Sequence, residues 1–377
     1  MSRILYIANA RIPTEKAHGI QIMKMCEAFA AAGNVVTLVI PHRFNHIQTD
    51  PYTYYGVKKN FEIKKVISFD LIFFGKIGFL VQSFSFAFFA FAYTLFHKRD
   101  VVYTRDYLSA YLSSFTKQRY LWEVHTKVEN LFIRRVVHRA DVVIAISAGL
   151  KRFYKKRFKE VSNIFVAHDG VDLALFSSKK DRNIRNTHDI PQDAFLVGYV
   201  GKFRTMGMKK GVEEIISSFG TLHKEASGVH LLLVGIEESE KEEVENLLSC
   251  AGAEPQNYTL VSHIPQEHVV DYLKASDVLV MNYPFTEHYA YYMSPLKLFE
   301  YMASGVPIVT TDLPSVREVL NEKSAVFIEP GNEAALVRGI KEIFSDRKQG
   351  DALAKEAFRL VQQYTWNNRA RTILAQI

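Results

Sequence analysis

Cysteine and tryptophan are both scarce in this sequence, with two residues of each among 377. The cysteines, Cys26 and Cys250, lie far apart and form no metal-binding motif, and a disulfide-stapled secreted domain is excluded. The chain begins directly with an apolar strand, RILYIAN, without the charged and apolar leader of a signal peptide. These absences predict a cytoplasmic protein in a reducing compartment.

The two familiar glycine motifs for nucleotide phosphates are also absent. The first loop, ARIPTEKAHG, is not a GxGxxG loop, and the later loop GKFRTMGMKKG is not a GxxxxGK[ST] loop. These differences argue against a dinucleotide-binding loop in the first case and a standard triphosphate P-loop in the second.

What the sequence does have is the composition of a folded globular protein with a basic surface. Hydrophobic residues make up 48% and charged residues 23%, and the formal net charge is +7. Such a charge attracts anions, and no nucleic-acid-binding module is recognisable. We therefore expect nucleotides or an acidic membrane face as partners, and no nucleic acid.

Strands and helices alternate along both halves of the chain, which predicts an α/β protein with two doubly wound, Rossmann-like parallel sheets. A polar stretch, 177–192, separates the halves and is interpreted as a linker. We expect domains at 1–176 and 193–355, with a terminal helix, 356–377, that crosses back to the first domain.

Polar residues follow several predicted strands of the first half, where open α/β sheets bind ligands. They include Arg105 and His125, and the first loop supplies His18 and Gly19. His125 is the most suggestive because imidazole can both donate and accept a proton near neutral pH. A structural histidine at a strand end and a simple turn glycine are the alternatives.

A second candidate site is the basic glycine loop that follows the strand 195–200. It carries Lys202, Arg204, Lys209 and Lys210 just before a helix. Glycines let a backbone approach a ligand closely, and cations at a helix start can hold phosphates. The alternative is a charged surface turn.

The stretch 288–309, HYAYYMSPLKLFEYMASGVPIV, predicts a loop, a short helix and a buried strand. We expect Ser294 as N-cap, Pro295 at the first helical position and Gly305 as a left-handed C-cap. The free N–H groups of Ser294, Leu296 and Lys297 form an anion site at the helix start, and Glu300 lies one turn further on the same side. An ordinary solvated Lys297–Glu300 salt bridge is the alternative.

The segment 71–96, LIFFGKIGFLVQSFSFAFFAFAYTLF, is rich in phenylalanine, and Lys76 is its only charged residue. Its length and composition fit three structures: a helix in the membrane interface, a buried core helix, or a spanning helix. A spanning helix would divide a βαβ domain and is the least favoured.

Taken together, the motifs resemble those of the retaining family 4 glycosyltransferases of the GT-B fold (glycosyl transferases group 1). The similarity runs over nearly the whole chain. It includes the early HG pair, WEVH, HDGVDLALF, GYVGKF…KKG, HLLLVG and, as the most specific run, SPLKLFEYMASG.

The resemblance implies two domains facing across a cleft, the first for the acceptor and the second for a nucleotide-sugar. It implies metal-independent, retaining transfer from a UDP- or GDP-linked co-substrate, with no other cofactor, to a saccharide or lipid-linked acceptor in cell-surface polysaccharide or glycoconjugate synthesis. Independently of the resemblance, the residues predict a cytoplasmic location, and the pattern of 71–96 predicts peripheral contact at the inner face of the cell membrane.

The resemblance also assigns roles to residues. His125, Lys210 and Lys297 are the implied catalytic residues, and His18, Arg105 and Tyr292 the implied contacts to acceptor or sugar. The implied donor-binding residues are Gly19, Lys202, Arg204, Lys210, Ser294, Pro295, Leu296, Lys297 and Glu300.

Two positions depart from the family pattern. Tyr292 stands where many members carry the first of two glutamates, so only Glu300 of that pair remains, and Asp169 stands where asparagine is common. Two other functions stay open: a nucleotide-sugar epimerase on the same fold, and a membrane-surface scaffold that uses 71–96.

Overall fold

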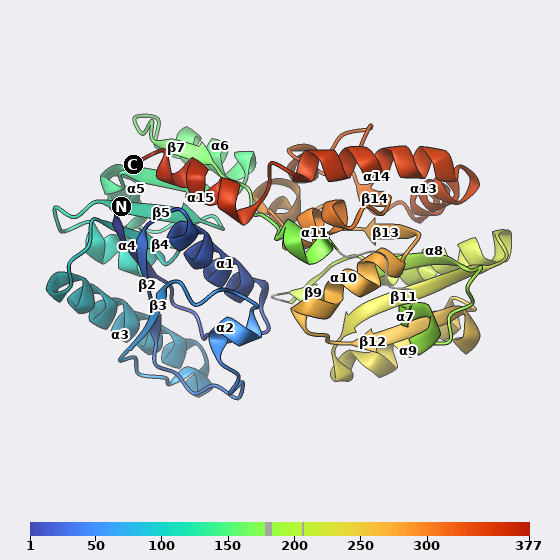
Figure 1. Cartoon of the computed structure of the whole chain (residues 1–377), viewed down its shortest axis with the longest axis horizontal. Coiled ribbons are helices and arrows are strands. Elements are labelled where there is room, and N and C mark those ends of the chain that lie inside the picture. Colours follow the sequence, from blue (N-terminus) through green and yellow to red (C-terminus); the bar gives the residue numbers. More distant parts are fainter. Residues whose placement is uncertain (178–182, 206) are drawn as a thin grey trace. The chain divides into compact units, whose positions relative to one another are not determined.

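The computed structural model describes residues 1–177, 183–205 and 207–377 and divides the chain into two compact units (Figure 1). Unit 1 comprises Met1–Asp169 and Trp366–Ile377, and unit 2 is the continuous stretch Gly170–Thr365. Each unit is built around its own parallel sheet.

The sheet of unit 1 has seven parallel strands in the order β3-β2-β1-β4-β5-β6-β7. The strands are short and, apart from β3, mostly apolar, and helices connect them, which is the pattern of parallel pairing. The strands are β1 (Arg3–Ile7), β2 (Val35–Pro41), β3 (Glu62–Val66), β4 (Val101–Thr104), β5 (Tyr120–Val124), β6 (Val142–Ala145) and β7 (Ile164–Val166). The helices are α1 (Ala17–Ala31), α2 (Pro51–Tyr54), η1 (Ile72–Phe74), α3 (Gly75–Phe96), α4 (Tyr107–Ser113), α5 (Ile133–Arg139), α6 (Ala148–Arg157) and α15 (Trp366–Leu374).

The sheet of unit 2 has six parallel strands in the order β12-β11-β8-β13-β14-β15. They are β8 (Phe195–Val200), β11 (Val229–Ile236), β12 (Tyr258–Ser262), β13 (Val278–Met281), β14 (Ile308–Thr311) and β15 (Val326–Ile328). A small antiparallel hairpin, β9 (Arg204–Thr205) and β10 (Met208–Lys209), stands apart from the sheet.

The helices of unit 2 connect and cover these strands. They are η2 (Leu173–Phe176), α7 (Asn183–Thr187), α8 (Val212–Glu225), η3 (Glu238–Glu240), α9 (Lys241–Cys250), η4 (Pro255–Asn257), α10 (Gln266–Ala275), a short π-helix η5 (His288–Tyr292), α11 (Leu296–Ser304), α12 (Pro314–Arg317), α13 (Glu333–Ser345) and α14 (Arg347–Val361). Two doubly wound parallel sheets confirm the predicted α/β, Rossmann-like architecture.

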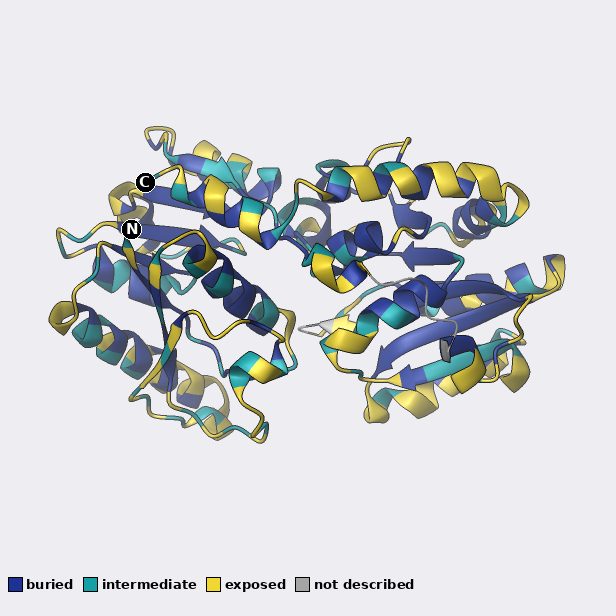
Figure 2. Ribbon diagram, in the orientation of Figure 1, coloured by how far each residue is buried: buried dark blue, intermediate teal, exposed yellow. Residues whose placement is uncertain are grey.

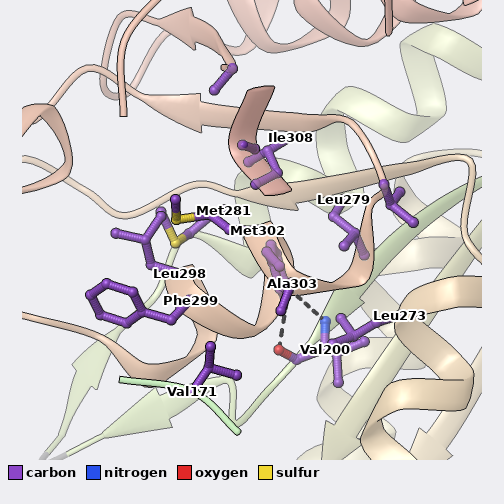
Figure 3. Packing of buried hydrophobic residues seen from close by; sticks show 14 of the residues in the cluster. Val171, Val200, Leu273, Leu279, Met281, Leu298, Phe299, Met302, Ala303 and Ile308 are labelled. Carbon is purple, nitrogen blue, oxygen red and sulfur yellow. Dashed lines mark hydrogen bonds between the residues drawn. The ribbon is translucent and has the colours of Figure 1, made fainter. Parts of the chain in front are cut away.

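Burial explains why the strands read as nearly continuous apolar runs. The inner strands of both sheets are buried on both faces, as Figure 2 shows in dark blue, whereas the edge strands β3 and β12 are partly exposed. In unit 2, α11 packs its apolar side onto this core, where Leu298, Phe299, Met302 and Ala303 lie near Met281 of β13 (Figure 3).

The division between the units differs from the domain boundaries expected from sequence. Residues 170–176 belong to unit 2, and the crossing back to unit 1 occurs at Trp366 rather than at 356, because α14 packs on α11. Of the expected linker 177–192, residues 178–182 lie outside the described residues. The rest is folded onto unit 2, where Arg185 is buried and bonds to Ala194 O and to Asp277.

Candidate functional site

The most unusual side chain of unit 2 is Lys297, in the first turn of α11. It is only 8% exposed, and its ammonium has no hydrogen-bond partner within the part of the chain that the structure describes. The Nζ atom lies 3.7 Å from the ring centroid of Tyr199, and the rings of Tyr283 and Tyr301 follow at 5.6 and 5.9 Å. Aromatic faces attract a cation but leave its N–H groups unsatisfied. The ammonium is therefore held in place without being neutralised.

Gly201, directly after β8, makes room for this ammonium. Its φ is +143°, a conformation that side chains rarely adopt, and a Cβ there would lie 3.0 Å from both Cε and Nζ of Lys297. The glycine that the sequence places after β8 thus allows the lysine to approach the backbone.

Lys210 lies near Lys297 because the chain turns sharply after it. Gly211 is the N-cap of α8 in a left-handed conformation, and a Cβ there would overlap the backbone oxygen of Asn282. The side-chain amide of Asn282, after β13, donates to Gly211 O at 3.1 Å. This contact fixes the start of α8 beside the carboxyl end of β13.

Burial and neighbouring charges lower the pKa of both lysines. Burial lowers the pKa of Lys297 well below its usual value, and the charge of Lys210 lowers it further, while Glu300 opposes both. Burial, together with Lys202, lowers the pKa of Lys210 to about 8. Two neighbouring lysines, with Glu300 as the opposing charge on Lys297, favour the binding of an anion.

Glu300 lies one turn beyond Lys297 on α11. Its carboxylate accepts a hydrogen bond from Gln266 Nε2 at 2.5 Å. Burial raises the pKa of Glu300, whereas Gln266 and Lys297 lower it. A carboxylate retains accepting capacity beyond this bond, which is the chemistry that binds a pair of vicinal hydroxyls.

The start of α11 differs in one detail from the prediction. The helix begins at Leu296 with Pro295 as N-cap, so Ser294 is not the N-cap. The reason is that Pro295 has an extended conformation, with ψ of 131°, and its carbonyl accepts the Leu298 N–H at 3.0 Å. Gly305 is the left-handed C-cap as expected, with φ of 70°. The amides of Leu296 and Lys297 precede the bond from Leu298, and amides at the start of a helix are typical anion-binding donors.

Lys202 and Arg204 of the basic loop are engaged by carboxylates in this structure. Lys202 Nζ lies 2.8 Å from Glu237, and Arg204 pairs with Glu243 at 2.5 Å. Of the cations in this loop, Lys210 is therefore the one that the structure brings to Lys297. The pairing partners are 35 and 39 residues away in sequence, which is why the loop alone gave no sign of them.

Tyr292 ends the π-helix that precedes α11. Its hydroxyl donates to Glu287 at 3.0 Å. The position thus presents a phenol in unit 2 where many family members are implied to present a carboxylate.

In unit 1 the predicted residues gather around a carboxylate that the sequence analysis missed. Glu123, the fourth of the five residues of the buried strand β5, is 0% exposed. It accepts from Gln21 at 2.7 Å and from Arg369 at 2.9 Å, and its Oε1 lies 2.5 Å from His125 Nε2. Tyr103 also donates to it. Burial raises the pKa of Glu123, but Arg369, His125 and Arg105 outweigh burial and hold that pKa well below its usual range.

Arg105 and His18 border this cluster. Arg105 donates to Gln21 Oε1, and its Nε lies 3.8 Å from Glu123 Oε1. Burial and the charge of Arg105 lower the pKa of His18 to about 3, and the same two causes lower the pKa of His125 against the opposing effect of Glu123. Arg105 and His125 follow β4 and β5, so the carboxyl-end rule placed them correctly.

His18 and Gly19 lie in the first turn of α1 rather than in the preceding loop, because the helix begins at Ala17. Gly19 has no room for a side chain, since a Cβ would lie 2.2 Å from Tyr55 Oη and 2.7 Å from Thr14. Tyr55 in turn bridges both backbone groups of Thr14. The structure thus gives Gly19 a packing role in unit 1.

Three further residues, Gln21, Asp169 and Arg369, complete the cluster around Glu123. The sequence did not indicate that they belong to it. Gln21 also donates to Asp169 at 2.8 Å, and Arg369 donates to His168 O at 2.8 Å. One signal was available: Glu123 interrupts the apolar run YLWEV, and a charge inside a buried strand requires a partner. Nothing local points to Arg369, which lies 246 residues away.

Among the described residues, no group of three or more His, Cys, Asp or Glu side chains has the arrangement of a metal site. The chemistry that the two units present consists of lysines, helix-start amides and a carboxylate in unit 2, and a buried His–Glu–Arg network in unit 1.

Two family models match the chain and together span most of it. Residues 180–360 match the model described as "Glycosyl transferases group 1", and residues 19–175 match the model of "Glycosyltransferase Family 4".

A curated relative is the capsular polysaccharide biosynthesis glycosyltransferase CapM of Staphylococcus aureus. It is 23% identical over 229 residues, which are 59% of this chain and 57% of CapM. The match thus spans little more than half of that relative.

Solved structures resemble the chain over its whole length. The sucrose-phosphate synthase of Thermosynechococcus elongatus has a TM-score of 0.79 at 20% identity and covers 100% of this chain and 98% of its own. The Anabaena protein HepE in complex with UDP-glucose has a TM-score of 0.74 at 14% identity, with complete coverage of both chains. At these identities the likeness establishes the fold.

Proposed function

Because the chain is a group 1 glycosyltransferase of the GT-B fold, we propose that it transfers a sugar from a nucleotide-sugar to a saccharide or lipid-linked acceptor. The proposed transfer retains the anomeric configuration, needs no metal, and serves cell-surface polysaccharide or glycoconjugate synthesis. The role named for CapM supports this assignment, and HepE's complex supports a UDP-linked donor, with a GDP-linked donor as the alternative.

The observation that carries the proposal is the buried ammonium of Lys297 at the start of α11, which has no hydrogen-bond partner among the described residues and feels the charge of Lys210. In transfer from a nucleotide-sugar, the bond between the anomeric carbon and the diphosphate breaks, and charge builds on the leaving oxygen. Ammonium groups and helix-start amides already oriented toward that oxygen stabilise the transition state without reorganising. The site supplies what the leaving group requires.

The remaining residues complete the proposed reaction. The acceptor hydroxyl attacks the anomeric carbon on the face from which the diphosphate leaves, and a diphosphate oxygen takes the hydroxyl's proton. Glu300 binds the ribose diol of the donor. His125, kept neutral by burial and oriented by Glu123, accepts or donates a hydrogen bond to a substrate hydroxyl.

The test begins with thermal unfolding in a panel of UDP-, GDP- and dTDP-sugars, because a bound donor stabilises the folded state by mass action. The donor that raises the melting temperature is then incubated, in EDTA, with an isoprenoid-linked or free saccharide acceptor. We expect a glycosylated product whose anomeric configuration, read by NMR, matches the donor. An inverted product or a requirement for metal would overturn the proposed mechanism.

Omitting the acceptor separates the other functions. An epimerase would convert the labelled nucleotide-sugar to its epimer without acceptor, and a scaffold would bind no nucleotide-sugar at all. Either result would overturn sugar transfer as the activity.

We expect affinity for the donor to fall as the pH rises above about 8, because that is where Lys210 loses its proton in the free protein. A bound diphosphate raises the pKa of this lysine. The complex therefore holds a proton that the free protein has lost, and binding weakens between the free and bound pKa values. Titration calorimetry from pH 7 to 9.5 measures both the affinity and the proton uptake.

The matched variants are Lys210→Arg and Lys209→Ala. Arginine stays charged throughout this range, so Lys210→Arg should flatten the pH dependence. Lys209, which is exposed and pairs with Glu213, should leave it unchanged when replaced. A pH dependence that persists in Lys210→Arg would assign the titration to another group.

A further inference from the structure

Helix α3 of unit 1 is oriented opposite to an ordinary surface helix. Its polar side chains Gln82, Ser83 and Thr94 are buried, whereas Phe84 and Phe88 are 55% and 60% exposed. The helix thus buries these polar side chains together with Phe86, and exposes several of its other phenylalanines.

Hydrogen bonds fix this orientation. Gln82 Nε2 donates to Asn9 Oδ1 at 2.8 Å, and Asn9 Nδ2 donates to Ser83 Oγ at 3.3 Å. Asn9 lies just after β1, so α3 is tied to the end of a central strand. A rotation of α3 that buried the phenylalanines would break these bonds, and Asn9 would lose its hydrogen-bond partners on the helix.

Four of the exposed apolar side chains of α3 form one stripe. Ile77, Leu80, Phe84 and Phe88 recur at three- and four-residue intervals, which places them on one side of a helix. Phe73 and Phe74 of η1 extend the stripe, and these six residues are named the α3 surface. Phe69 packs beside it and, with Phe89, borders a shallow apolar groove. Monomeric soluble proteins rarely expose such a patch without an occupant.

The charges around the α3 surface favour an anionic occupant. No Asp or Glu occurs between residues 71 and 99. Lys76 in the first turn and Lys98 just after the last turn are both exposed. Lysines at the two ends of an apolar helix can reach up to phosphate headgroups while the apolar side enters the lipid. A second copy fits less well, because pairing two such helices in either direction places lysines against lysines.

The packing of α3 argues against a spanning helix. Ile72–Phe96 is long and apolar enough to cross a membrane by length and composition, yet one side of α3 packs against α4, β2 and β3. Figure 2 shows this division between buried and exposed positions along α3. A helix held in this way lies flat against its own domain.

We propose that the α3 surface is a membrane-docking site that inserts into the boundary between headgroups and acyl chains of an anionic bilayer. The lysines give the preference for anionic lipid, and the aromatic stripe gives the insertion. The inference does not depend on which sugar is transferred, or on whether sugar transfer is the activity.

The test is sedimentation of the full chain with vesicles of phosphatidylcholine containing 30% phosphatidylglycerol, and with vesicles of phosphatidylcholine alone. We expect binding to the anionic vesicles, and a loss of at least tenfold in the double variant Phe84→Ser/Phe88→Ser. The matched control Phe285→Ser/Phe358→Ser removes two exposed phenylalanines of unit 2 and should bind as the unaltered chain does. Circular dichroism and the melting temperature verify that both variants are folded.

Insertion is measured separately with Phe88→Trp. Both native tryptophans, Trp122 and Trp366, are buried, so a new tryptophan at 88 dominates any change on binding. We expect a blue shift and quenching by lipids brominated near the headgroup, and weaker quenching from bromines near the bilayer centre.

Three results would overturn the proposal. The first is an unaltered chain found only in the supernatant. The second is a Phe84→Ser/Phe88→Ser variant that binds as well as the control. The third is a dimer, seen by light scattering, that this variant dissociates. The last result would assign the α3 surface to a second copy of the chain.

Discussion

Replacing Lys297 by methionine should sharply reduce the rate of sugar transfer and at the same time make the free protein harder to unfold. Methionine retains the apolar stem within the Tyr199, Tyr283 and Tyr301 rings but removes an ammonium that has no hydrogen-bond partner among the described residues. An unsatisfied buried polar group costs about 1–3 kcal/mol, so its removal should raise the free energy of unfolding by a similar amount. Opposite effects on stability and function are typical of a side chain retained for function.

The expected loss of turnover follows from the leaving group. Removing one preorganised charge from a developing oxyanion reduces the rate by about 100- to 1000-fold. The measurements are the rate of sugar transfer and the urea dependence of unfolding, each with and without donor. Lys209→Met serves as the control, because that exposed lysine precedes Lys210 and should change neither quantity appreciably. Unchanged turnover in Lys297→Met would contradict the site assignment, and a large loss of stability would contradict the description of Lys297 as unneutralised.

Replacing Arg369 by methionine should destabilise unit 1 by about 3–5 kcal/mol, because it leaves a buried carboxylate without its closest cation. Arg369 donates to Glu123 at 2.9 Å, and both side chains are almost completely inaccessible. Without Arg369, the pKa of Glu123 should rise from the depressed value that it has in the unaltered protein. The loss of stability in the variant should therefore grow as the pH rises above that depressed pKa, because the unpaired carboxylate then ionises.

Two variants make this prediction specific. Arg371→Met removes an exposed arginine from the same helix and should leave unfolding unchanged. Glu123→Gln added to Arg369→Met should recover part of the loss, because the amide carries no charge and still bonds to its neighbours. Urea unfolding, followed by hydrogen exchange in β5, measures the effect on unit 1. A loss no larger than that of Arg371→Met would show that the network around Glu123 is not sustained by Arg369.

The sequence predicted the parts of the site that depend on local rules. Gly305 ends α11 because a left-handed C-cap favours glycine, and His125 and Arg105 lie at strand ends because parallel strands present their carboxyl ends together. The start of α11 was displaced by one residue, since a proline with an extended backbone serves as the cap there.

What the sequence could not predict depends on partners distant in the chain. Lys202 and Arg204 resembled Lys210 as loop cations, and only the folded structure shows Glu237 and Glu243 beside the first two. The orientation of α3 was ambiguous for another reason: its apolar residues occur on every side, so periodicity alone gave no outward face. The hydrogen bonds from Asn9 resolve that ambiguity.

The division of unit 1 into two segments has a consequence for the order of assembly. Synthesis from the amino terminus produces Gln21, Glu123 and Asp169 early, but Arg369 is added only after the whole of Gly170–Thr365. Unit 2 is continuous and can complete its sheet as it leaves the ribosome, whereas domains ordinarily finish in the order of their synthesis. Here the first unit to begin is the last to be completed, and a chain stalled before Trp366 would carry a finished second unit beside a first unit that still lacks its central counter-charge.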